Sequence, residues 1–422
     1  MNTPLSEHVD DHLLEKQRPS GIVFLLFIFW TFVLVCRPQD LFPFLAAFRP
    51  ALLCTALALG SAVFSGVLFR GPSIFAERQG KLYMALFLVM ILSVPFSLYV
   101  GLSFKFLFTA YIVIVAHFFL FLKLVDSIQK LAVLLFVTCL GSGIYAAISV
   151  KTGNIVDGRL FFGDMFDPND LAFFALSFLP LNLLFITGEN PLWKRAAGLL
   201  CFAVSLLMIL LTGSRGGLLA VGLVGLLLLF RKTQTITVSM KFVAVGLVLA
   251  ILSVSTLNVE RYATMLNLKE DYNVHGEEGR LFLWSIGMRA MLKKPLTGVG
   301  VMCFPNAVGL ERETGTGESQ AWETAHNSII QIGTETGLVG LILFLLISLN
   351  VLRIFNKARK EAASDLLVKI SEMGFAGFVG LFASGMFLSQ AYSIYWAMYV
   401  AISAVASRLL SRQQALLNQK KA

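Results

Sequence analysis

Long apolar runs are the feature of this sequence that most limits what the chain can fold into. A membrane-spanning helix needs about 20 mostly apolar residues, within a range of about 17–25. Charged residues make up only 14% of the 422-residue chain, whereas soluble domains carry about 25%. The sequence therefore predicts an all-α, polytopic membrane protein. We expect twelve spans, at 21–36, 45–69, 82–99, 105–123, 131–150, 171–188, 196–212, 216–230, 242–257, 337–352, 373–389 and 392–409.

The distribution of basic residues predicts the orientation, because short loops rich in Lys and Arg stay cytoplasmic. With the N-terminus inside, 21 of the 34 basic residues fall in inner segments and 6 in short outer segments. The net charge of +9 therefore faces the anionic inner leaflet and requires no nucleic-acid partner. The predicted organisation is a cytoplasmic tail at 1–20, transmembrane helices 1–9 at 21–257, a periplasmic loop at 258–336, helices 10–12 at 337–409 and a cytoplasmic tail at 410–422.

The outer loop contains a mostly apolar stretch at 280–292 with helical character. It is too short to span, so it should lie at the interface or insert into the bundle from outside. Arg280 and Arg289 are nine residues apart, and steps of about 100° put them roughly half a turn out of phase. Only one of them can face a shared pocket. We favour Arg280, which shares a face with Trp284 and Gly287, and expect Arg289 to snorkel toward headgroups.

The end of the outer loop predicts a second short helix that starts near Thr324, contains His326 and Asn327, and ends at Gly337. The preceding stretch, Glu311–Gln320, is rich in Gly, Thr and Glu and is expected to be a mobile loop.

Arg215 stands in the sequence Gly213-Ser-Arg-Gly-Gly217, between two apolar spans. A cation at this depth costs about 2.5–3.5 kcal/mol unless it is paired or hydrated. Glycine lets an anionic group approach the backbone closely, and the amides at the start of the following helix add positive charge. We predict a phosphate site of Arg215, Ser214 and Gly216. The alternative is a tight hairpin whose arginine snorkels outward.

His326 is one of five histidines, and an isolated histidine is more often structural than catalytic. Its imidazole is nonetheless suited to take a proton near neutral pH. Glu335 follows nearby, and three interpretations stay open: it orients a base, pairs with an arginine or is a solvated charge.

Asp164, Asp167 and Asp170 are spaced by three and could share a metal ion. The favoured interpretation is that Asp167 is the N-cap of the next span, with Pro168 at the first helical position. We therefore expect no metal and no cofactor.

Two patterns together resemble the O-antigen ligase and polymerase family of bacterial envelope proteins. The first is Gly213-Ser-Arg-Gly-Gly217. The second is His326-Asn327, followed after nine residues by Gly337-Leu-Val-Gly340. Arg280 with Trp284, and Pro295-Leu-Thr-Gly-Val-Gly300, also match between them. The resemblance covers about 213–340, and the number of predicted spans is similar to the family's.

This resemblance implies a metal-independent, inverting ligase of the inner membrane, with its active site on the periplasmic face. The donor would be a glycan on undecaprenyl diphosphate and the acceptor a hydroxyl of lipid A–core. Arg215 and Arg280 would hold the diphosphate and His326 would be the base, with Trp284, Arg289, Asn327 and Glu335 as candidate supporting residues. The alternatives are an O-antigen or exopolysaccharide polymerase and a protein O-oligosaccharyltransferase. A transporter is less expected, because it predicts charges in mid-membrane and repeated halves.

Overall fold

The computed structural model describes residues 21–70, 72–163, 167–187, 189–235, 279–316 and 323–421. Helices dominate this part of the chain. Their bounds are α1 Gly21–Cys36, α2 Pro38–Leu41, η2 Pro43–Phe48, α3 Pro50–Phe64, η3 Val67–Phe69, α4 Arg78–Ser93, η4 Val94–Phe96, α5 Val100–Lys105, η5 Phe106–Tyr111, α6 Ile112–Leu124, α7 Ile128–Thr152, α8 Pro168–Ile186, α9 Leu192–Leu211, α10 Arg215–Phe230, α14 Arg280–Lys293, α15 Phe304–Thr316, α16 Ser328–Glu361, α17 Asp365–Gly385 and α18 Ile394–Lys421.

Eight helical stretches in the described residues are long and apolar enough to cross a membrane, and α1, α3 and α10 are shorter apolar helices. The predicted fold class, a polytopic all-α membrane protein, is confirmed. Eleven of the twelve predicted spans coincide with these helices. The remaining one, at 242–257, lies outside the described residues, so the number twelve stays a prediction.

The predicted span at 45–69 is divided. The short 3-10 helix η2 ends at Phe48, Arg49 adopts a left-handed conformation with φ 45°, and α3 begins at Pro50. Proline lacks an N–H and disfavours a helical conformation in the residue before it. The main apolar helix of this segment therefore starts at Pro50, and the predicted start at 45 was wrong.

The helix that follows His326 breaks where the sequence predicted. Gly337 has φ 72° and ψ −173° inside α16, which separates a first segment from the long apolar one. The start of the helix differs from the prediction. It begins at Ser328, four residues later than the predicted Thr324, because the Asn327 side chain caps it by accepting from the amides of Ile329 and Ile330. His326 therefore precedes the helix.

The prediction of a loop at Glu311–Gln320 was wrong for its first half, since α15 extends to Thr316. The helix is held by a small core in which Phe304 and Val308 pack with Leu283 and Ile286 of α14. This burial outweighs the low helix propensity of the Gly- and Thr-rich end. Residues 317–322 lie outside the described part, and with them the rest of the predicted loop.

A two-stranded antiparallel hairpin joins α7 to the segment before α8. Strand β1 (Asn154–Val156) pairs with β2 (Arg159–Phe161). Asp157 and Gly158 form the two-residue turn and both have positive φ, as hairpin turns of the primed types require. The hairpin places Arg159 beside the end of α9.

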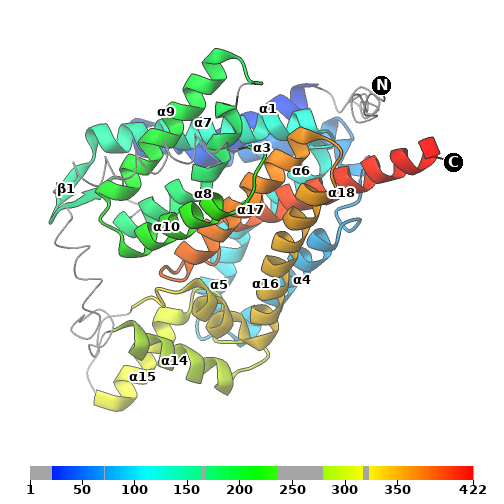
Figure 1. The fold of residues 1–422 in the computed structure, drawn as a ribbon. Coiled ribbons are helices and arrows are strands. Elements are labelled where there is room, and N and C mark those ends of the chain that lie inside the picture. Colours follow the sequence, from blue (N-terminus) through cyan, green and yellow to red (C-terminus); the bar gives the residue numbers. More distant parts are fainter. Residues whose placement is uncertain are drawn as a thin grey trace.

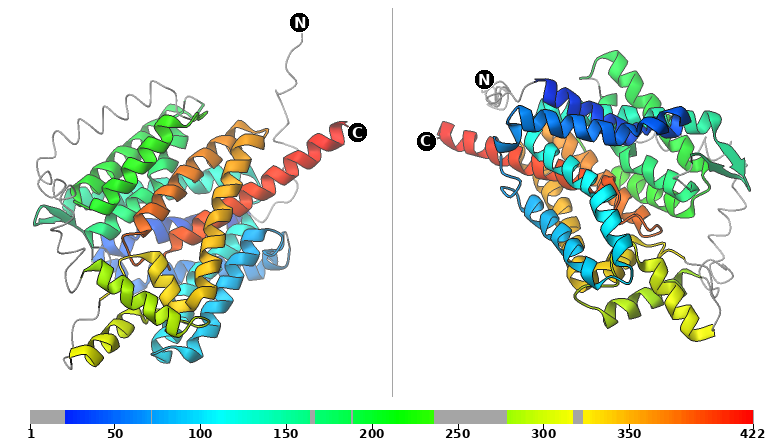
Figure 2. Two further views of the ribbon diagram at one scale, coloured as in Figure 1. Left: turned by 60° about the horizontal axis from the view of Figure 1, so that its bottom comes forward. Right: turned by 180° about the vertical axis from the view of Figure 1, so that it is seen from behind.

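The start of α1 and the end of α18 lie at one end of the bundle, whereas the β-hairpin, α14 and α15 lie toward the opposite end (Figures 1 and 2). Helix α8 packs against α7, α9 and α17. The apolar window of α8 is 83% buried within the protein, as is that of α18, so both helices lie in the interior of the bundle.

Candidate active site

Arg215 occupies the first position of α10, directly after the N-cap Ser214. The Ser214 Oγ accepts a hydrogen bond from the Gly217 amide at 3.2 Å, and Gly213 before it has φ 59°. The free amides at a helix start carry partial positive charge. The predicted phosphate site is thus a capped helix N-terminus with an arginine on its first residue, and Ser214 shapes it by capping the helix.

Arg280 likewise begins a helix, α14. Its guanidinium carbon lies 5.9 Å from the ring centroid of Phe387. Gly216 packs on the same ring, because a Cβ built on this glycine would lie 2.8 Å from the Phe387 Cβ. The starts of α10 and α14, which are far apart in the sequence, therefore meet at one phenylalanine in the loop between α17 and α18.

His326 has a left-handed backbone, with φ 45°. Such a conformation is costly for a non-glycine residue and persists only where the surroundings hold it. Three contacts do so: the His326 amide donates to the Ser389 Oγ at 2.8 Å, the Trp284 indole donates to the Ala325 carbonyl at 2.9 Å, and the Asn327 cap fixes the helix behind it. Trp284 and Asn327 therefore position the histidine-bearing turn.

Burial lowers the pKa of the half-buried His326 imidazole, and the positive charge of Arg280 lowers it further, whereas the Asp167 carboxylate acts in the opposite direction. Electrostatic interaction of this kind weakens steeply with distance and screening. The charges of Arg280 and Asp167 thus both act on His326, and the lowered pKa favours the neutral imidazole, the form that can accept a proton.

The favoured interpretation of Asp167 is confirmed: it is the N-cap of α8 and accepts from the amides of Asn169 and Asp170 at 2.7 and 2.8 Å. Asp170 accepts from the side-chain amide of Gln390 at 2.8 Å. Asp164 lies outside the described residues. Within the described part of the chain, no three His, Cys, Asp or Glu side chains form a group that could hold a metal ion.

Glu335 is fully buried, so the interpretation of a solvated charge was wrong. Its carboxylate accepts from the Tyr392 hydroxyl at 2.6 Å and from the amides of Met302 and Phe304 at 2.8 and 3.1 Å. Glu335 therefore links the segment that follows α14 to the α17–α18 loop through these hydrogen bonds.

Arg289 is exposed and pairs with Glu311 of α15, as Lys293 does, at 3.3 and 3.4 Å. It lies on the opposite face of α14 from Gly287, whose Cα packs against Thr334 and Ile330 of α16. The half-turn separation of the two arginines is thus observed. The partner of Arg289 is a carboxylate of the protein, which the snorkelling prediction did not include.

Two features near the site were missed in the sequence. Arg159 donates to the Thr212 carbonyl at 3.1 Å and to the Asn169 Oδ1 at 3.0 Å, which links the end of α9 to the start of α8. The feature of the sequence that could have indicated Arg159 is its position directly after an Asp-Gly turn. The other is the α17–α18 loop at 386–393, most of which was assigned to the two neighbouring spans at 373–389 and 392–409, so that only 390–391 was left between them.

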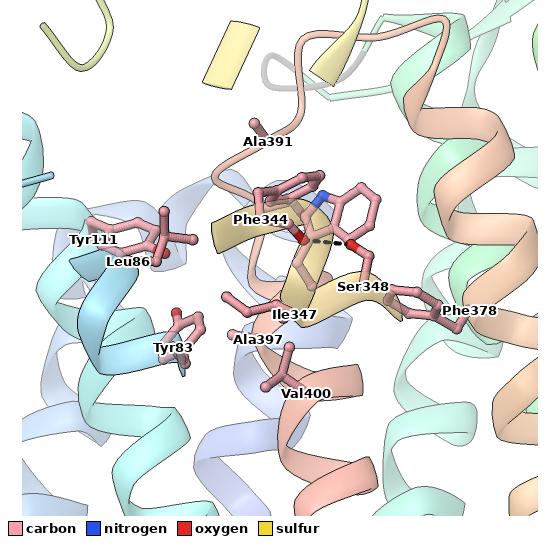
Figure 3. A pocket seen from close by; sticks show the side chains of 12 residues that line it. Tyr83, Leu86, Tyr111, Phe344, Ile347, Ser348, Phe378, Ala391, Ala397 and Val400 are labelled. Atoms are coloured by element: carbon pink, nitrogen blue, oxygen red, sulfur yellow. Dashed lines mark hydrogen bonds between the residues drawn. The ribbon is translucent and has the colours of Figure 1, made fainter. Parts of the chain in front are cut away.

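A small cavity lies within the bundle, between α4, α16 and α18 (Figure 3). Tyr83, Tyr111, Phe344 and Trp396 are among its lining residues, and its volume is about 20 Å³, which is room for a water molecule. The Ser348 hydroxyl that faces it already donates to the Phe344 carbonyl. None of the predicted site residues lines this cavity, which is also too small for a lipid tail.

The fold and the gathering of Arg280, His326 and the start of α10 define a multi-pass membrane protein with a cationic site at one end of its helix bundle. Residues 200–345 match the family model described as O-Antigen ligase, so this part of the chain is similar to that family. The resemblance seen in the two motifs is confirmed.

Two curated relatives are also similar to parts of this chain. The exopolysaccharide production protein ExoQ of Rhizobium meliloti (strain 1021) is 28% identical over 219 residues, which cover 49% of this chain and 48% of that protein. A protein of Rickettsia conorii (strain ATCC VR-613 / Malish 7), provisionally named a polysaccharide ligase, is 25% identical over 121 residues, 28% of each chain. The aligned regions thus span half or less of these relatives. Both comparisons thus make the chain similar to proteins named for O-antigen ligation, exopolysaccharide production or polysaccharide ligation.

Proposed function

We propose that this protein transfers a glycan from undecaprenyl diphosphate to a hydroxyl of lipid A–core, at the periplasmic face of the inner membrane. The observation that carries the proposal is the meeting of His326, Arg280 and the arginine-bearing start of α10 around the α17–α18 loop. An arginine whose charge acts on the imidazole, with a second arginine at the adjoining helix start, suits a reaction with a diphosphate leaving group and a hydroxyl nucleophile.

In the proposed reaction, Arg215 and Arg280 bind the diphosphate of the donor. Guanidinium groups form strong, charge-assisted hydrogen bonds to phosphate, and they stabilise the negative charge that grows on the leaving oxygen. The His326 imidazole takes the proton of the acceptor hydroxyl, whose oxygen attacks the anomeric carbon. The bond from that carbon to the phosphate oxygen breaks, its electron pair leaves with the diphosphate, and the anomeric configuration inverts.

The strained backbone of His326 supports its role as the base. A left-handed, non-glycine residue held by contacts from three sides is costly, and such strain clusters at functional sites. The lowered pKa of this half-buried imidazole also favours its neutral form, which is the one that accepts a proton.

The likeness to ExoQ favours a second candidate, an exopolysaccharide polymerase. It would use the same donor and the same three side chains, but the acceptor would be the sugar of a second carrier-linked glycan. The two functions differ only in the molecule whose hydroxyl is deprotonated by His326: lipid A–core in one case, a carrier-linked glycan in the other.

The test is an assay of purified protein with carrier-linked glycan, with and without lipid A–core. We expect transfer to lipid A–core, and a loss of about 10²–10⁴-fold in His326→Ala, the usual contribution of a general base. Arg280→Ala should also lose activity, whereas Arg289→Ala, on the opposite face of the same helix, should retain it. Full activity of His326→Ala would overturn the proposal. Elongation of the carrier-linked glycan without lipid A–core would establish the polymerase instead.

A further inference from the structure

We propose that the α17–α18 loop, residues 386–393, is the positioning element of the site, in which Ser389 sets the place of His326 and Phe387 sets that of Arg280. The inference rests on the proposed function and adds two residues to it. Neither contacts the reacting atoms in this proposal, so both act through the side chains that they hold.

Ser389 provides the hydrogen-bond acceptor for the backbone amide of His326. The left-handed turn at His326 directs its amide away from the helix that follows, and the Ser389 Oγ accepts that amide at 2.8 Å. A buried amide without a partner is unfavourable. Removing the hydroxyl therefore favours a different backbone conformation at His326, in which the imidazole points elsewhere.

Other contacts keep the loop in place without Ser389. The Ser328 Oγ donates to the Leu388 carbonyl at 2.8 Å and accepts from the Gln390 amide at 3.1 Å. The Gln331 side chain accepts from the Ala391 amide at 3.1 Å. These bonds join the loop to the first turns of α16. A change at Ser389 thus alters the histidine turn while the loop retains its other attachments.

Phe387 acts on the cationic side of the site. Its ring lies 5.9 Å from the Arg280 guanidinium carbon, within the range of cation–π attraction. The same ring packs on Gly216 at the start of α10, beside Arg215. Phe387 therefore sets the spacing between the two arginine-bearing helix starts, which must fit one diphosphate.

The two residues have different kinetic signatures in steady-state transfer assays. Ser389→Ala should lower kcat at least 10-fold with little change in the KM for the donor, and should shift the acid limb of the pH profile as the imidazole moves. Ser389→Thr, which keeps the hydroxyl, should restore most of the activity. The matched control is Ser393→Ala in the same loop, whose hydroxyl caps Tyr395 and not His326, and which should leave kcat unchanged.

Phe387→Leu should instead raise the KM for the donor, and should weaken binding of farnesyl diphosphate used as a probe, whereas Phe387→Trp should retain binding. Folding of each variant is checked by size-exclusion chromatography and thermal melting in detergent. If Ser389→Ala is recovered only as aggregate, Ser389→Cys, with a weaker acceptor in the same space, takes its place in the test.

The inference is wrong if Ser389→Ala keeps the wild-type kcat and pH profile, or if Phe387→Leu binds the probe like wild type, while His326→Ala is inactive. Failure of the proposed function gives another result: His326→Ala and Arg280→Ala then transfer glycan normally, whatever the loop variants do.

Discussion

At the scale of single residues, the charge around His326 predicts how the reaction depends on pH. Burial and Arg280 lower the pKa of the imidazole, and Asp167 only partly opposes them. The base must be neutral to accept a proton, and a lowered pKa keeps it neutral to lower pH. We therefore expect kcat/KM to fall on the acid side with an inflection below about 6.5, the ordinary value for histidine.

Removing the charge of Arg280 tests the cause of that shift. Arg280→Gln should raise the pKa of His326 and move the acid inflection to higher pH, although transfer itself is slower. An NMR titration of the His326 ring protons measures this pKa without relying on activity. Arg289→Gln on the far face of α14 is the control and should not move it. A pKa above 6.5 in the wild type would contradict the electrostatic account.

Gly216 offers a second test at this scale. A Cβ at this position would lie 2.8 Å from Phe387, whereas one at Gly222 in the same helix meets no atom within 4 Å. Gly216→Ala should displace the ring and lower kcat/KM by about 100-fold, the effect expected of a small misplacement. Gly222→Ala should keep activity and stabilise the helix by about 1 kcal/mol. Equal activities of the two variants would show that Phe387 and Gly216 do not set the site.

The sequence predicts His326, Arg215 and Arg280 as site residues because a histidine or an arginine beside apolar segments is chemically conspicuous. It missed Ser389 and Phe387, which are ordinary residues of a membrane protein. Their importance comes from contacts with segments 63 and 107 residues away in the chain, and no local pattern encodes such contacts.

At the scale of elements, Gly337 is the position where one substitution should matter most for stability. Its φ of 72° and ψ of −173° belong to a region that only glycine occupies readily. An added Cβ would also lie 2.5 Å from the Pro295 carbonyl. Gly337→Ala should cost at least about 1–3 kcal/mol, measured as a lower Tm in detergent. Gly225→Ala, which meets open space, is the control, and a Tm for Gly337→Ala equal to that of wild type would exclude the constraint.

Element boundaries were predictable where they depend on local chemistry. The Asp167 cap, the break at Gly337 and the half-turn between Arg280 and Arg289 follow from propensity and helix geometry. Helix α15 was missed because its formation depends on packing against α14. The turn before Ser328 was missed because it depends on the bond from His326 to a distant loop.

At the scale of the whole molecule, the apolar runs were enough to predict the class of fold, since only helices of bilayer length satisfy the backbone of such a chain in lipid. The contacts between helices were not predictable from these runs, because most apolar helices of a bundle look alike in sequence. The orientation rests on the basic residues alone, and it decides on which side of the membrane the proposed reaction takes place.

Cysteine labelling in intact cells tests that orientation. Lys293 at the end of α14 and Lys357 near the end of α16 are 69% and 56% exposed, and α14 lies toward the opposite end of the bundle from the end of α16 (Figure 1). The five native cysteines are all buried, so wild type gives the background. A membrane-impermeant maleimide should label Lys293→Cys in cells whose outer membrane alone is permeabilised, and Lys357→Cys only after the inner membrane is opened. The reverse pattern would place the arginines and His326 on the cytoplasmic side, where a periplasmic glycan ligase cannot act.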